Sequence, residues 1–61
     1  MNTKSAESRE VPGPRLHSIV CVQTHGITRT GIVVDIDDVW RMFTLFAYGR
    51  YFTYRWSDIL P

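Results

Sequence analysis

The feature that most constrains this chain is a series of turn signals between short β-branched and aromatic runs. They stand at Gly26, Asp37-Asp38 and Tyr48-Gly49. Glycine accepts the positive φ of tight turns, and aspartate side chains accept hydrogen bonds in turn geometry. The runs between these turns lack helix caps and alternate in character, which indicates strands. The sequence therefore predicts an all-β fold, a small antiparallel barrel of four to five strands.

The expected elements follow from these boundaries. Strands are expected over residues 17–24, 29–36, 39–47 and 50–56, followed by a single 3₁₀ turn at Ser57-Asp58. We expect that turn to return Ile59 and Leu60 to the core. The β-barrel domain is accordingly assigned to residues 16–61.

The first part of the chain, residues 1–15, has a different character. It is polar and contains Pro12 and Pro14, which block both helix and strand hydrogen bonding. Such a segment buries too little apolar area to offset the entropy of ordering it. We expect a flexible or extended N-terminal arm, which either has no role or becomes ordered only against a partner.

Length, cysteine count and charge narrow the class of protein. The chain has 61 residues and one cysteine, Cys21, so we expect one domain and no internal disulfide, with a preference for a reducing compartment. A chain of this size buries only about 60% of the surface that its unfolded form exposes, so its stability is marginal. The net charge of +1 lacks the large basic excess of most nucleic-acid-binding proteins. No apolar run is long enough to predict a membrane span, and the N-terminus has no apolar signal core.

Alternation within the strands assigns the large side chains to two faces. The side chains expected in the core are Ile32, Val34, Ile36, Trp40, Met42, Phe46, Phe52 and Trp56. Those left for the outer face are Phe43, Leu45, Tyr48, Tyr51 and Tyr54. The third strand is therefore apolar on both faces, and a contiguous exposed patch calls for cover. Either a partner surface buries it, or the arm folds back over it with Val11, Pro12 and Leu16.

Three quoted segments carry a resemblance to a known fold family. "SIVCVQT", "GIVVDI" and "WRMFTLFAYGRYFTYRWSDIL" resemble the strands of small Src-homology-3-like barrels, and in particular small proteins of tailed bacteriophages. The resemblance covers roughly residues 18 to 60. It implies a phage-encoded viral protein that is found in the virion or in the cytoplasm of an infected bacterial host.

These observations favour a non-catalytic protein–protein interaction module. A virion accessory subunit, bound to capsid or tail, fits an arm attached to a barrel, and so does a subunit that binds a host protein. The expected partner is a larger protein assembly or another copy of the chain. The residues predicted to contact it are Phe43, Leu45, Tyr48, Arg50, Tyr51 and Arg55.

The alternative function is nucleic-acid binding by a small β-barrel. Tyrosine stacks on bases and arginine pairs with phosphates. The residues that would do so are Arg41, Arg50, Tyr51, Tyr54 and Arg55. Arginine and tyrosine are also enriched in protein–protein interfaces, so their presence does not decide between the two functions.

Catalysis and metal binding find little support in the sequence. His17, Cys21 and His25 are spaced by four, unlike the paired short spacings of structural zinc sites. The aspartates at 35, 37 and 38 lack the glycine and distal glutamate of a calcium loop. No third group orients a Cys–His pair for nucleophilic attack. We therefore predict no enzyme activity, no catalytic residues, no metal, no cofactor and no small-molecule substrate.

Overall fold

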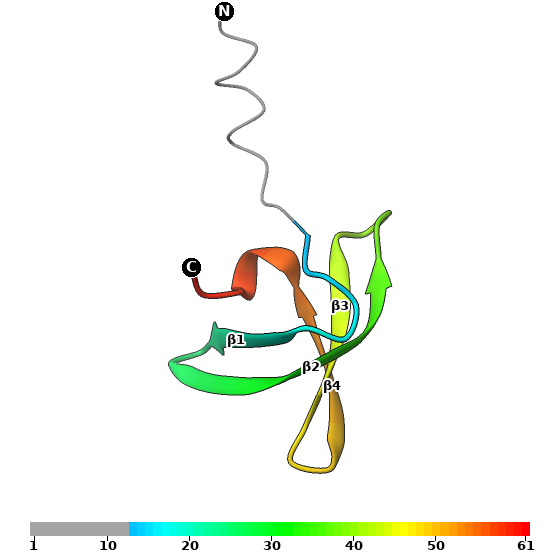
Figure 1. Cartoon of the computed structure of the whole chain (residues 1–61). Helices are drawn as coiled ribbons and strands as arrows, with labels where there is room; N and C mark the ends of the chain where they lie inside the picture. Colours follow the sequence, from blue (N-terminus) through cyan, green and yellow to red (C-terminus); the bar gives the residue numbers. More distant parts are fainter. Residues whose placement is uncertain (1–12) are drawn as a thin grey trace, which may run out of the picture.

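The computed structural model describes residues 13–61 (Figure 1). Its elements are β1 (Ile19–Thr24), β2 (Ile27–Asp37), β3 (Met42–Ala47), β4 (Arg50–Arg55) and the 3₁₀ turn η1 (Trp56–Asp58). The strands of this described part form one antiparallel sheet in the order β1-β2-β3-β4. The all-β prediction and its four strands are therefore confirmed. The prediction of an N-terminal arm falls mostly on residues 1–12, which lie outside the described residues.

Two hairpins are closed by two-residue turns. Thr24 pairs with Ile27 across His25-Gly26, and Ala47 pairs with Arg50 across Tyr48-Gly49. All four turn residues have positive φ, 51° and 78° in the first turn and 55° and 73° in the second. This is the turn geometry that matches the twist of antiparallel strands and that favours glycine at the second position. The predicted turns at Gly26 and at Tyr48-Gly49 are confirmed.

The connection from β2 to β3 is longer than predicted. The Asp37 carboxylate accepts hydrogen bonds from the backbone N–H groups of Val39 (3.0 Å) and Trp40 (3.1 Å). This fixes the predicted turn at Asp37-Asp38, but β3 begins only at Met42. Trp40 consequently sits in the turn with 74% of its surface exposed. The prediction that Trp40 is a strand residue of the core is wrong.

An irregularity in β2 bends the sheet. The register to β3 shifts between Val33 and Asp35, which leaves Val34 as an extra residue, and such bulges bend a strand and increase its twist. Figure 1 shows β2 curving so that its first half runs beside β1 and its second half beside β3. Gly31 precedes this irregularity in β2, at a point where a Cβ atom would fall 2.9 Å from both Leu45 and Ala47 side-chain atoms.

The C-terminal segment returns to the far edge of β1. Ile59 forms an antiparallel bridge with Val22, and the Leu60 N–H donates to the Cys21 carbonyl at 2.8 Å. Trp56 anchors the turn before it, since its ring Nε1–H donates to the Met42 carbonyl at 3.1 Å. The predicted 3₁₀ turn is confirmed. Ile59 packs against the core, whereas Leu60 remains more than a third exposed.

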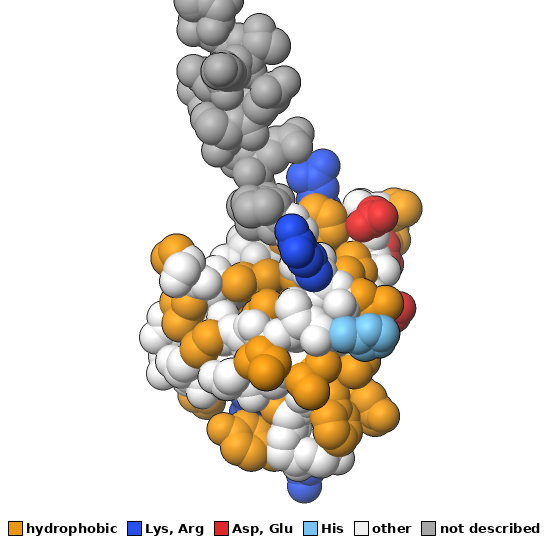
Figure 2. Space-filling model, in the orientation of Figure 1, with side chains coloured by type: hydrophobic (Ala, Val, Ile, Leu, Met, Phe, Trp, Pro, Cys, Tyr) orange, Lys and Arg blue, Asp and Glu red, His pale blue; other side chains and the backbone are white. Residues whose placement is uncertain are grey.

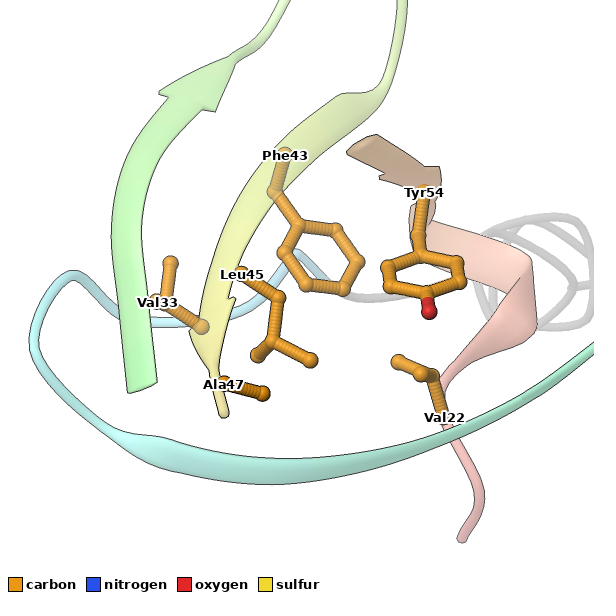
Figure 3. Packing of buried hydrophobic residues seen from close by; sticks show 6 residues of the cluster. All are labelled: Val22, Val33, Phe43, Leu45, Ala47 and Tyr54. Carbon is orange, nitrogen blue, oxygen red and sulfur yellow. The ribbon is translucent and has the colours of Figure 1, made fainter. Parts of the chain in front are cut away.

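The core lies on the concave side of the curved sheet (Figure 3). Its buried side chains are Val22, Val33, Phe43, Leu45, Ala47 and Tyr54. Of the core predicted from sequence, Ile36, Phe52 and Trp56 are partly buried and pack against this cluster. The prediction is wrong for Ile32, Val34 and Phe46, which are exposed, and Met42 is only partly buried. The bulge at Val34 explains the error in β2, because an extra residue changes which side chains share a face.

Candidate functional site

A row of large apolar side chains crosses the outer face of the sheet. Ile19 pairs with Ile32, Ile32 with Phe46, and Phe46 with Tyr51, so each strand contributes one residue. Directly paired residues project to the same side of an antiparallel sheet. We call these four residues the outer row. Their exposed fractions are 71%, 41%, 37% and 70% in strand order, and none of them is charged.

The outer row is exposed because the inner face has already filled the core. On β2 and β3 the sequence neighbours of the row, Val33 and Leu45, are completely buried. Successive strand residues point to opposite faces, so a strand that buries these side chains must turn Ile32 and Phe46 outward. The row is therefore apolar surface left over after the interior of the chain is packed.

Two members of the outer row are held in contact with each other. The ring centroids of Phe46 and Tyr51 lie 5.1 Å apart with the planes tilted by 52°. Aromatic pairs of this geometry contribute about 0.5–1.5 kcal/mol beyond the area that they bury. The aromatic end of the row is thus an ordered surface rather than two independent side chains.

Polar residues border the outer row on the side toward η1. The next paired row on the same face is Asp35, Thr44 and Thr53, and the one after it is Asp37, Met42 and Arg55. Figure 2 shows hydrophobic side chains spread over much of the visible face, with acidic side chains at one edge of it. An apolar centre with a polar border is the usual anatomy of a protein–protein interface.

The residues predicted to contact a partner divide into two groups. Tyr48, Arg50, Tyr51 and Arg55 are exposed. Phe43 and Leu45 are 2% and 0% exposed, so the prediction that they face outward is wrong. Both faces of β3 are apolar, and the larger contribution to the core comes from the face that the sequence interpretation assigned to the surface.

The residues of the nucleic-acid alternative do not form one surface. Tyr54 is buried, and its ring lies 6.0 Å from that of Phe43. Arg41 lies over the Trp56 ring at 5.6 Å, so its guanidinium already has an aromatic partner. Tyr51 and Arg55 project from the outer face of β4, whereas Arg50 and Tyr54 belong to the inner face of the same strand.

Arg29, which no prediction included, is held within the fold. Its guanidinium lies 4.0 Å from the centre of the Phe52 ring and donates a hydrogen bond to the Tyr54 hydroxyl. A cation over an aromatic ring is stabilised by about 0.5–2 kcal/mol without any ligand. These contacts give Arg29 a structural role in satisfying the one polar atom that Tyr54 brings into the core.

A cleft of about 590 Å³ opens between the β1–β2 turn and β4. It is lined by Gln23, Thr24, His25, Met42, Thr53, Tyr54, Arg55 and Asp58. The Asp58 carboxylate accepts a hydrogen bond from the Arg55 backbone N–H at 3.0 Å and so fixes the start of η1.

Within residues 13–61, no three histidine, cysteine, aspartate or glutamate residues are grouped so that they could hold a metal ion. In the same residues no helix has the length and apolar character needed to cross a membrane.

Comparison with protein-family models, curated proteins and solved structures finds no significant match to this chain. Function is therefore inferred from the geometry of the outer row. Three of its members, Ile19, Ile32 and Phe46, were absent from the predicted partner residues. The two-residue turns give their pairing, because counting back from each turn aligns Ile19 with Ile32 and Phe46 with Tyr51.

Proposed function

We propose that this protein is a non-catalytic protein–protein interaction module that docks through its outer row. One observation carries the proposal: exposed apolar side chains from β1, β2, β3 and β4 lie in register across the sheet. Scattered exposed apolar residues are ordinary, but a contiguous apolar patch marks an interaction surface. Burying such a side chain completely is worth about 1.5–3 kcal/mol, so four of them supply a useful driving force.

The border of the outer row supports a protein partner over a nucleic acid. Asp35 and Asp37 lie on the same face as the row, and carboxylates repel phosphate. Arg55 is the one arginine of the paired outer-face rows. A strand of DNA or RNA laid along Tyr51 would therefore meet both charges, whereas a protein surface can complement both.

The finer assignment of the fold belongs to the same proposal. The bridge between Val22 and Ile59 closes the C-terminal segment onto β1, and this supports a barrel of the Src-homology-3-like type. A phage origin, with a capsid- or tail-associated accessory role or binding to a host protein, is proposed from the sequence resemblance alone.

A site-specific photo-crosslinking experiment tests the proposed docking surface. The full chain is expressed in bacteria with a photoreactive phenylalanine analogue in place of Tyr51, or in place of Trp40 as a control. Trp40 is equally exposed but lies in the β2–β3 turn, away from the outer row. We expect discrete protein adducts from the first position and none from the second.

A further substitution makes that experiment decisive. Ile19→Lys in the same chain places a charge at the other end of the outer row and should abolish the adducts formed at position 51. Adducts that are sensitive to nuclease instead of protease would favour the nucleic-acid alternative. The proposal is wrong if position 51 gives no adduct, or if its adducts equal those of position 40.

A further inference from the structure

We propose that the occupant of the outer row is a second copy of this chain, with the two outer rows packed face to face in a symmetric dimer. This inference rests on the proposed function and names its partner. In such an interface the same patch serves both subunits, because a two-fold axis relates them.

The small size of the core favours self-association. Among residues 13–61, only six hydrophobic side chains are buried. Small chains usually add a disulfide, a metal or an oligomer contact to a core of this size. Cys21 is the single cysteine of the chain, and the described residues contain no metal-ion group. Packing against a second copy would add buried apolar area and so increase the stability of the fold. A second copy is also available wherever the chain is synthesised.

The area of the outer row matches what a weak dimer needs. A fully exposed large side chain presents on the order of 150–250 Å², so the exposed fractions of the row and of neighbouring Val34 amount to roughly 500 Å². Complete burial of both rows would amount to roughly 1,000 Å², which is below the roughly 1,200–2,000 Å² of stable specific interfaces and in the range of weak, transient ones. The structure therefore points to a dimer that forms at high protein concentration.

The chemistry of the outer row is self-complementary in one orientation. A two-fold axis parallel to the strands exchanges β1 with β4 and β2 with β3. It lays Ile19 against Tyr51 of the second copy, and Ile32 against Phe46 of the second copy. Each contact then joins an aliphatic side chain to an aromatic ring. The bordering Asp35 faces Thr44 of the second copy rather than its own equivalent, so no like charges meet.

Sedimentation velocity and native mass spectrometry of the full chain test this inference. The chain should shift from monomer to dimer only as its concentration rises toward roughly 1 mM, because an interface of about 1,000 Å² is a weak one. Ile19→Glu and Tyr51→Lys should each weaken the dimer by at least about tenfold, because each buries an uncompensated charge. Trp40→Lys, the matched control, should leave the dimer unchanged.

Mixing the two charged variants tests the orientation. A heterodimer of the Ile19→Glu chain with the Tyr51→Lys chain has one Glu–Lys pair and one unaltered Ile–Tyr contact. It should form more readily than either variant alone. Failure of the mixture, when wild type dimerises and both variants do not, would overturn the orientation of the axis.

The remaining outcomes separate this inference from the proposed function. Both substituted side chains are about 70% exposed in the single chain, so circular dichroism should show each variant folded. A strict monomer at all concentrations overturns the dimer. If crosslinking at position 51 then still captures a different protein, the proposed function stands with another partner. Adducts of twice the chain mass support the dimer, and the absence of any adduct overturns both.

Discussion

Both faces of β3 carry large apolar side chains, but only one of them is buried. Phe43 and Leu45 point inward and are buried, whereas Phe46 points outward and keeps more than a third of its surface exposed. Hydrophobicity alone cannot account for the difference, since a phenylalanine lies on each side. The inner side chains converge with Val22 and Tyr54 from the two edge strands (Figure 3), while Phe46 lies on the opposite face of the sheet. Curvature of the sheet decides which apolar face becomes the core.

The largest contrast is expected from consecutive alanine substitutions on β3. Leu45→Ala should leave a cavity and cost about 2–5 kcal/mol of unfolding free energy, enough to unfold a domain of this size. Phe46→Ala, one residue further on the outer face, should cost clearly less, because it removes contacts that are already half open to water. Urea denaturation followed by circular dichroism measures both. Equal losses would show that the two faces contribute equally to the core.

A smaller effect is expected at Gly31, where β2 lies close to the backbone and side chains of β3. Gly31→Ala places a Cβ atom against Leu45 and Ala47 and closer still to the Phe46 carbonyl oxygen, so the β2–β3 pairing must open. Overpacking of this kind costs about 1–3 kcal/mol. Gly26→Ala is the control: it has the same added methyl group and open space around it, and its cost comes from positive φ alone, about 1 kcal/mol. If thermal unfolding showed the same loss of stability for both variants, close packing at Gly31 would be contradicted.

The smallest effect is expected from a polar substitution in the outer row. Ile19→Thr keeps the β-branched shape on an exposed edge strand, so the unfolding free energy of the dilute monomer should change by no more than about 0.5 kcal/mol. The same substitution should reduce association measured by sedimentation. Val20→Thr, its partly buried neighbour on the inner side, should be more destabilising in the same dilute melt. A reversal of that order would place Ile19 in the core.

The sequence was sufficient for the elements and turns of the fold. Gly26 and Gly49 identified two hairpins, and the two-residue turns determine the register of the strands beside them. Asp37 identified the third turn through its side-chain acceptor. These features depend on the backbone preferences of a few neighbouring residues, so a short stretch of sequence is enough to predict them.

The choice of inner face on β3 could not be read from the sequence, whereas on β4 the assignment of Phe52 to the core was right. Alternation separates two faces but assigns neither to the core when both are apolar, as on β3. Because of the extra residue at Val34, Ile32 and Ile36 lie on opposite faces of β2, whereas simple alternation predicts the same face for both. The prediction that some aromatic side chains stay exposed is right for Tyr51. It placed Phe43 and Leu45 on the surface and Phe46 in the core, whereas the structure has the reverse. Only the curvature of the assembled sheet distinguishes them.

The two tryptophans stand in opposite surroundings, which gives the chain a built-in pair of optical probes. Trp40 is largely exposed to solvent, so its fluorescence emission should be red-shifted and quenched by iodide whether or not the chain is folded. Trp56 is partly buried, has the Arg41 guanidinium over its ring, and donates its indole N–H to the Met42 carbonyl. With Trp40→Phe, the remaining indole should report unfolding by a shift in emission wavelength, with no external dye attached to the sheet.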